Sequence, residues 1–188
     1  VSQGYKELSE KSKWKIEKGG KYFLTRNESS VIAFRVPKKD MESFMISAAH
    51  SDSPTFKVKE NPVRTSEGMT QLVTEGYGGM LMAPWFDRPL SVAGRVLIEK
   101  GEELYAKRVD LDKDLLIIPS VAIHMNREAN KGIKYNMSVD TYPLLSHSDK
   151  ADLNTAILDE IGEEGAKIIG HDLYLYLREK GTLLGLDQ

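Results

Sequence analysis

The chain has no cysteine among its 188 residues. Without thiols it can form no disulfide, thiolate zinc site, iron–sulfur cluster or cysteine nucleophile. Any metal that it binds must therefore be held by nitrogen and oxygen ligands. The absence of cysteine also fits a reducing compartment, and we expect the chain to be cytoplasmic.

Long hydrophobic runs and an excess of one charge are also absent. No apolar run approaches the roughly 18 residues that a membrane span needs, and residues 1–6 do not resemble a signal peptide. The 26 basic and 28 acidic side chains give a net charge of −2. This balance argues against a dedicated nucleic-acid or anionic-membrane protein, because such partners usually select a basic surplus. We expect neither a membrane nor a nucleic acid as partner.

What remains is the composition of an ordinary globular protein, with 40% hydrophobic and 29% charged residues. The length allows one compact unit or a unit with an insertion, and it is sufficient for a sizeable core.

Most of the regular patterns are typical of strands. Residues 21–25 and 30–36 are rich in β-branched and aromatic side chains and predict a hairpin. Residues 44–50 are apolar at nearly every position, which predicts a strand covered on both faces. Short strands at 92–99, 104–109 and 115–118 indicate a small barrel or sandwich. At 172–178, leucine alternates with tyrosine, and this period of two predicts another strand.

One segment has helical periodicity. Leu153, Ile157 and Ile161 repeat every four residues, Asp149 or Asp152 can cap the start, and Gly162 can end the helix.

The first candidate site is His50 with Asp52, at the end of the apolar run. On a strand, residues i and i+2 point to the same side, so the carboxylate of Asp52 can approach the imidazole of His50. Metal-bound histidines are commonly oriented in this way. The same pair also occurs as a purely structural contact between a histidine and a carboxylate.

Three further segments hold groups of polar or flexible residues, each with a structural alternative. The glycine-rich residues 75–79 could admit a ligand close to the backbone or simply reverse the chain. Residues 85–95 pair aromatic with charged side chains ahead of a strand, and they could equally be a segment that crosses between domains. His124 and Arg127 follow an apolar stretch, where a histidine is often part of the core or the surface.

Taken together and in order, these segments resemble one family. The quoted stretches are AAHSDSPTFKVK at 48–59, EGYGG at 75–79, WFDRPLSVAGRV at 85–96, IPSVAIHMNR at 118–127, N at 136 and DLYLY at 172–176. From about Lys21 to its last residue, the chain closely resembles the aspartyl aminopeptidase / aminopeptidase I family of zinc metallopeptidases.

The resemblance implies an aminopeptidase with two zinc ions that removes acidic or neutral N-terminal residues from peptides. Cobalt or manganese could substitute for zinc, because a site of nitrogen and oxygen ligands discriminates among these ions by geometry and availability more than by affinity. His50 matches a zinc ligand, and Asp52 matches the acidic residue that orients it. His124 matches a histidine counted with the metal and catalytic residues, which reaches the active site of a neighbouring subunit and would donate a hydrogen bond to the developing oxyanion.

The implied fold is an α/β zinc-exopeptidase-like catalytic domain, present only in part, with an inserted β-rich barrel-like domain. We expect residues 1–84 to be the N-terminal part of the catalytic domain, residues 85–170 the inserted oligomerisation domain, and residues 171–188 a return strand into the catalytic domain. The resemblance also implies a large tetrahedral homo-oligomer.

The chain departs from the family in its completeness. Family members are roughly twice as long, and they supply an aspartate, two adjacent glutamates, a further aspartate and a histidine after the segment that matches 172–176. A catalytic zinc normally needs about three protein ligands, so we expect these 188 residues alone to be inactive. One alternative is a non-catalytic fragment or assembly module. A less favoured one is single-strand nucleic-acid binding through the basic and aromatic residues of 11–26.

Overall fold

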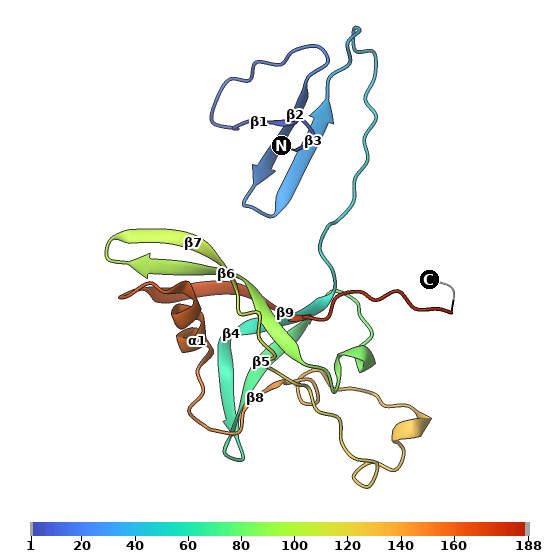
Figure 1. Ribbon diagram of the computed structural model, residues 1–188, viewed down its shortest axis with the longest axis vertical. Helices are drawn as coiled ribbons and strands as arrows, with labels where there is room; N and C mark the ends of the chain where they lie inside the picture. Colours follow the sequence, from blue (N-terminus) through green and yellow to red (C-terminus); the bar gives the residue numbers. More distant parts are fainter. Residues whose placement is uncertain (1, 187–188) are drawn as a thin grey trace. The chain divides into compact units, whose positions relative to one another are not determined.

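The computed structural model describes residues 2–186 and divides the chain into two compact units, Val1–Ser51 and Asp52–Gln188 (Figure 1). Each unit is built mainly from β-strands, and each is described by itself below.

The first unit contains a three-stranded sheet in the order β1-β2-β3. Its strands are β1 (Lys6–Glu7), β2 (Lys21–Arg26) and β3 (Ser30–Arg35). The antiparallel β2–β3 pair confirms the predicted hairpin. Within the described residues of this unit, Tyr22 and Leu24 are the buried hydrophobic side chains, and the Tyr22 ring packs 5.6 Å from that of Phe34.

Residues 44–50 do not form the strand that their apolar pattern predicts. This segment has no regular secondary structure, and Phe44, Met45 and Ile46 are 77%, 101% and 85% exposed. A buried strand needs neighbouring strands to pair its backbone groups and a packed layer to cover its side chains. No strand in residues 2–186 pairs with the segment, so the prediction of a covered strand is wrong for this structure.

The second unit is built on a six-stranded antiparallel sheet in the order β7-β6-β9-β4-β5-β8 (Figure 1). The strands are β4 (Thr55–Ser66), β5 (Met69–Tyr77), β6 (Leu90–Lys100), β7 (Glu103–Asp110), β8 (Leu144–Ser146) and β9 (Lys167–Leu177). Strands β6, β7 and β9 confirm three of the sequence predictions. The β4–β5 hairpin was not predicted; its two-residue turn, Glu67–Gly68, has positive φ at both positions, as a tight hairpin turn requires.

Helix α1 (Leu153–Ile161) packs against the core of this unit and confirms the predicted helix. Asp152 caps its start by accepting a hydrogen bond from the Thr155 N–H at 2.9 Å, and Gly162 ends it in the left-handed conformation. Leu153 and Ile157 are fully buried on the face that meets the sheet.

The predicted strand at 115–118 is reduced to isolated bridges. Leu116 pairs with Leu90 at the start of β6, Ile117 pairs with Leu144 of β8, and Ile118 pairs with Phe86. The segment therefore lies between two strands from distant parts of the sheet order. No closed barrel is found in the described part of the chain, and the barrel-like form of the inserted domain stays a prediction.

The described residues also include two short 3-10 helices, η1 (Ala83–Trp85) and η2 (Ala129–Lys131). Strands β4 and β5 precede residue 85, and β9 crosses residue 171, yet all three share one sheet with β6. The division at 51/52 thus differs from the expected boundaries at 84/85 and 170/171, which remain a prediction. Among the described residues, no helix combines the length and apolar character needed to cross a membrane.

Candidate functional site

The predicted zinc ligand and its partner lie on either side of the division between the two units. His50 is near the end of the first unit, in the segment without regular structure, and its side chain is exposed. Asp52 begins the second unit and is also exposed. The strand on which the two side chains were expected to share a face is absent.

Asp52 is held by Tyr77, which the sequence analysis did not single out as its partner. The Tyr77 hydroxyl donates a hydrogen bond to Oδ2 of Asp52. Strand pairing explains the contact, because Tyr77 at the end of β5 lies opposite Thr55 at the start of β4. The hydrogen bond to the carboxylate, aided by its negative charge, raises the pKa of Tyr77, since it favours the protonated phenol.

The glycine-rich segment 75–79 therefore serves to place a side chain. Gly78 follows Tyr77 with φ of +74°, a left-handed conformation that turns the chain past Pro54. The Tyr77 ring also packs edge-on to that of Tyr174, with centroids 5.4 Å apart. A tyrosine just before two glycines was the available signal, but its partner 25 residues away could not be read from local spacing.

A second polar group surrounds Asp172 on β9. Nζ of Lys57 lies 2.9 Å from Oδ1 of Asp172, Nε of Arg95 lies 3.6 Å from Oδ2, and the Tyr174 hydroxyl donates to Oδ1 at 2.9 Å. Burial alone would raise the pKa of Asp172, but the bonds from Lys57 and Tyr174 outweigh it and lower that pKa. The carboxylate is thus fully engaged in joining β4, β6 and β9.

The segment 85–95 makes a set of contacts with the segment that precedes His124. The Asp87 carboxylate accepts hydrogen bonds from the Ser120 N–H at 2.9 Å and from the Ser120 hydroxyl. These two bonds lower the pKa of Asp87. Trp85 packs edge-on to the buried Phe56, with ring centroids 5.4 Å apart, so the aromatic pair contributes to the core as well.

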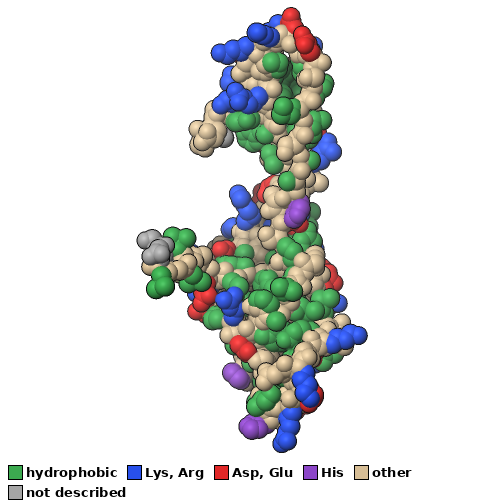
Figure 2. Space-filling view, turned by 90° about the vertical axis from the view of Figure 1, so that its right-hand side faces the viewer, with side chains coloured by type: hydrophobic (Ala, Val, Ile, Leu, Met, Phe, Trp, Pro, Cys, Tyr) green, Lys and Arg blue, Asp and Glu red, His purple; other side chains and the backbone are tan. Residues whose placement is uncertain are grey.

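His124 lies on the exposed loop that follows Ile118. Its neighbours Val121, Ile123 and Met125 are 60%, 46% and 80% exposed. Figure 1 shows this yellow and orange part of the chain extending away from the sheet. Hydrophobic side chains are also visible elsewhere on the molecular surface, as Figure 2 shows for one face. A run of exposed apolar side chains of this kind marks a surface suited to contact with another protein.

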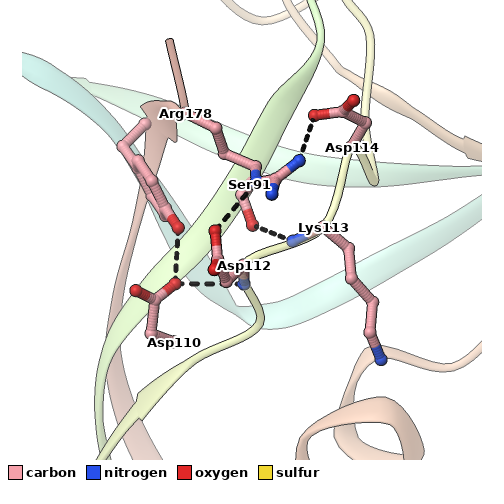
Figure 3. A network of polar contacts seen from close by, with 7 residues as sticks. Ser91, Asp110, Asp112, Lys113, Asp114 and Arg178 are labelled. Carbon is pink, nitrogen blue, oxygen red and sulfur yellow. Dashed lines mark hydrogen bonds and ion pairs between the residues drawn. The ribbon is translucent and has the colours of Figure 1, made fainter. Parts of the chain in front are cut away.

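A third group joins the end of β9 to residues 110–114 (Figure 3). Nε of Arg178 lies 2.8 Å from Asp112 Oδ1 and its Nη1 lies 2.8 Å from Asp114 Oδ1, and these bonds raise the pKa of Arg178. Asp110 accepts a hydrogen bond from the Tyr176 hydroxyl at 2.5 Å. The aspartates are therefore partnered by groups of the chain itself, which gives this cluster a structural role.

The basic and aromatic residues of 11–26 are partly used in packing and pairing. Tyr22 is only 3% exposed, Trp14 packs against Phe34, and Arg26 forms an ion pair with Glu10. A buried ring cannot stack on a nucleotide base, so Tyr22 does not support the alternative that this segment binds single-stranded nucleic acid.

The residues present do not by themselves fit a zinc site. Within residues 2–186, no three or more His, Cys, Asp or Glu side chains come together in a group that could hold a metal ion. One exposed histidine and one carboxylate are fewer than the roughly three protein ligands that a catalytic zinc needs.

Comparison with known proteins gives a consistent result. A family model described as "Aminopeptidase I zinc metalloprotease (M18)" matches residues 1–188. A "Probable M18 family aminopeptidase 2" of Clostridium novyi (strain NT) is 45% identical over 196 residues, covering 98% of this chain and 45% of the relative. The chain thus spans less than half the length of that protein.

Solved structures agree. In a structure titled "Cryo-EM structure of the Ape4 and Nbr1 complex", the matched chain is 36% identical with a TM-score of 0.87, covering 98% of this chain and 40% of that one. The S. cerevisiae mApe1 dodecamer is 26% identical with a TM-score of 0.72, covering 98% and 44%. Because the family model matches all 188 residues of the chain, and the relative from Clostridium novyi is 45% identical over 98% of it, the chain belongs to the aminopeptidase I zinc metalloprotease (M18) family.

Proposed function

We propose that the chain is part of a zinc-dependent aminopeptidase that removes N-terminal residues, acidic or neutral, from peptides. The observation that carries the proposal is the family match over all 188 residues. The relative from Clostridium novyi bears the name of an aminopeptidase and aligns with almost the whole chain.

In this proposal, His50 is a zinc ligand and Asp52 orients it. The hydrogen bond from Tyr77 supports the second role, because it fixes one oxygen of the carboxylate and so limits the directions in which the other can point. The described residues do not assemble a group that could hold a metal ion. In this proposal, the remaining ligands of the two zinc ions therefore come from residues other than those that the structure describes. In this proposal, cobalt or manganese can substitute for zinc when it is supplied in place of zinc, because a site of nitrogen and oxygen ligands selects among these ions by geometry and availability more than by affinity.

The proposal gives residues 85–170 a role in assembly. They would form the inserted barrel-like domain, joined by residues 171–188 to the catalytic domain, and would carry the contacts of a tetrahedral homo-oligomer. The dodecameric state of the yeast mApe1 structure and the exposed apolar side chains around His124 support this role. His124 would then act at the active site of a neighbouring subunit, and the protein would work on cytoplasmic peptides.

The test uses the full-length protein that contains this chain. Hydrolysis of aspartyl, glutamyl and leucyl p-nitroanilides is measured before and after metal removal with a chelator, and again after zinc, cobalt or manganese is added back. His50→Ala should lose one bound metal and nearly all activity, whereas Asp52→Asn should retain metal better than rate. Loss of such an orienting partner typically costs about 10- to 100-fold in affinity or activity.

His147→Ala is the matched control, because His147 is also exposed but lies outside every quoted motif. Full activity in the His50→Ala variant would overturn the ligand assignment. The 188-residue chain alone should bind zinc weakly, because its described residues bring together no group of three or more metal-binding side chains. A tight complex with two zinc ions per chain, measured by calorimetry, would contradict that expectation.

A further inference from the structure

Asp87 occupies an unusual backbone conformation and makes three hydrogen bonds to one short segment. Its φ of 57° lies in the left-handed region, which few residues other than glycine, asparagine and aspartate adopt. Its N–H donates to the Ile118 carbonyl at 2.9 Å. Its carboxylate accepts from both the N–H, at 2.9 Å, and the hydroxyl of Ser120.

The residue before it contacts the other end of the same loop. The Phe86 ring stacks on that of Tyr135, with centroids 4.6 Å apart and an interplanar angle of 27°. Phe86 also forms a parallel bridge with Ile118, which is fully buried. Two consecutive residues, Phe86 and Asp87, therefore hold both ends of residues 119–134.

Between these ends the loop is supported mainly by its own turns. The N–H groups of Met125 and Asn126 both donate to the Ala122 carbonyl, at 2.8 and 3.3 Å. No strand forms within 119–134, and its regular element is the three-residue η2. Because the loop side chains near His124 are exposed, packing does little to fix the loop, and its placement depends on its anchored ends.

We infer that Asp87 is a positioning residue that fixes the start of residues 119–134 and thereby sets the place of His124. This inference rests on the proposed function of His124. Asp87 itself touches no reacting group. Its effect on catalysis would pass through the loop, and a displacement of about 1 Å at a catalytic group can lower a rate by about 100-fold.

Asp87→Asn is an informative variant. Asparagine tolerates left-handed φ, so the backbone is not strained by the change. The amide keeps one oxygen acceptor for the two donors of Ser120 and loses the negative charge. Ser120→Ala is the complementary variant, because it removes the hydroxyl and leaves the carboxylate and the backbone bond in place.

Asp112→Asn is the matched control. Asp112 also has positive φ, of 40°, is exposed, and accepts a charge-assisted bond, from Arg178 at 2.8 Å. It lies outside residues 119–134. If replacing any exposed aspartate with positive φ lowers stability in general, the loss would therefore appear in both Asp87→Asn and Asp112→Asn.

The first measurement is hydrogen exchange on the full-length, zinc-loaded protein. Asp87→Asn and Ser120→Ala should each speed exchange of amides in residues 120–128 by about 10-fold or more relative to the parent, because their anchor is weakened. Asp112→Asn should leave these amides unchanged. Unchanged exchange in both Asp87→Asn and Ser120→Ala would overturn the inference, whatever their activity.

The second measurement combines the variants with His124→Ala. We expect Asp87→Asn to lower kcat by about 10- to 100-fold with KM little changed, and to have no further effect on kcat in the His124→Ala background. An equal loss of kcat in both backgrounds would overturn the inference, because Asp87 would then act independently of His124. If His124→Ala is fully active while exchange is still faster in Asp87→Asn, the proposed role of His124 fails and the anchoring by Asp87 stands.

Discussion

The two compact units differ in how their hydrophobic side chains are used. Among the described residues 52–186, fifteen hydrophobic side chains form one buried cluster, including Phe56, Leu72 and Leu173. In residues 1–51, the structure describes two buried hydrophobic side chains and a run at 44–46 that is more than three-quarters exposed. The second unit therefore carries most of the hydrophobic stabilisation of the chain.

The two units also differ in net charge. Residues 1–51 contain 10 basic and 6 acidic side chains, a net charge of +4, whereas residues 52–188 contain 16 basic and 22 acidic side chains, a net charge of −6. The near-neutral total conceals two regions of opposite sign. The net charge of the whole chain thus shows that the protein is not strongly basic, but it does not show that one unit is basic and the other acidic.

The largest effect is expected from Phe56→Ala in the 188-residue chain. Phe56 is fully buried and packs against Trp85, so truncation should lower the free energy of unfolding by about 3–5 kcal/mol. Phe44→Ala, the same substitution at a 77% exposed position of the first unit, should change it by less than about 0.5 kcal/mol. Urea denaturation measures both. A comparable loss in Phe44→Ala would show that residues 44–50 are buried, as their sequence pattern predicts.

Gly94→Ala should come next. Gly94 has φ of 154°, and a Cβ atom at this position would lie 2.1 Å from the Asp172 carbonyl oxygen on the neighbouring strand. Backbone strain and overpacking together should cost about 2–4 kcal/mol. Gly101→Ala, which also has positive φ but meets no atom within 4 Å, separates the two causes and should cost about 1 kcal/mol. Equal losses in the two variants would mean that the strand contact contributes nothing.

The third prediction concerns pH. Glu163 accepts a hydrogen bond from Lys107 at 2.6 Å and another from Tyr105, which lower the pKa of Glu163 from 4.5 to about 2, and the same contact raises the pKa of Tyr105 to about 12. Because the folded-state pKa is below the unfolded one, the stabilisation is complete above pH 4.5 and is lost as the pH falls through about 2.

Glu163→Gln should therefore have a lower melting temperature than the parent at neutral pH. The difference should shrink between pH 4.5 and pH 2. Glu164→Gln, at an exposed neighbouring position, serves as the control and should follow the parent. A difference between Glu163→Gln and the parent that stays constant down to pH 2 would contradict the assigned ion pair.

The smallest effect is expected from Tyr22→Phe in the first unit. The Tyr22 hydroxyl accepts a hydrogen bond from the Glu17 N–H at 3.0 Å, and its loss should cost about 0.5–1.5 kcal/mol. Tyr5→Phe, in the same unit, is the matched control. Thermal unfolding followed by tyrosine fluorescence measures both. A loss above about 3 kcal/mol would indicate that this unit is more cooperative than its small core implies.

Sequence patterns predicted the elements whose determinants are local. Helix α1 has its cap, its periodicity and its terminating glycine within one short segment, and the β2–β3 hairpin is likewise contiguous. The β4–β5 hairpin was missed because the alternation in β4 is interrupted between Val58 and Val63, where the strand register shifts. Residues 44–50 were predicted to be a strand from their composition, which says nothing about whether a partner strand is present.

In the candidate site, too, only the residues of continuous sequence motifs could be predicted. His50, Asp52 and His124 could be proposed from motifs, because each motif is continuous in the sequence. Tyr77 and Ser120 could not, because their bonds to Asp52 and Asp87 join positions 25 and 33 residues apart. Such contacts depend on strand pairing and on the bridges around Ile118, which no local pattern specifies.

The exposed residues 44–49 have a consequence for the behaviour of this chain at high concentration. They combine aromatic and aliphatic side chains with no charge and no proline, the composition of segments that self-associate through intermolecular β-pairing. Strand β7 lies at an edge of its sheet, yet Glu103, Lys107 and Arg108 place charges along it, and charged edges resist such pairing. Self-association of the isolated chain is therefore expected from residues 44–49 before the charged β7 edge, and a lysine introduced at Met45 should suppress it.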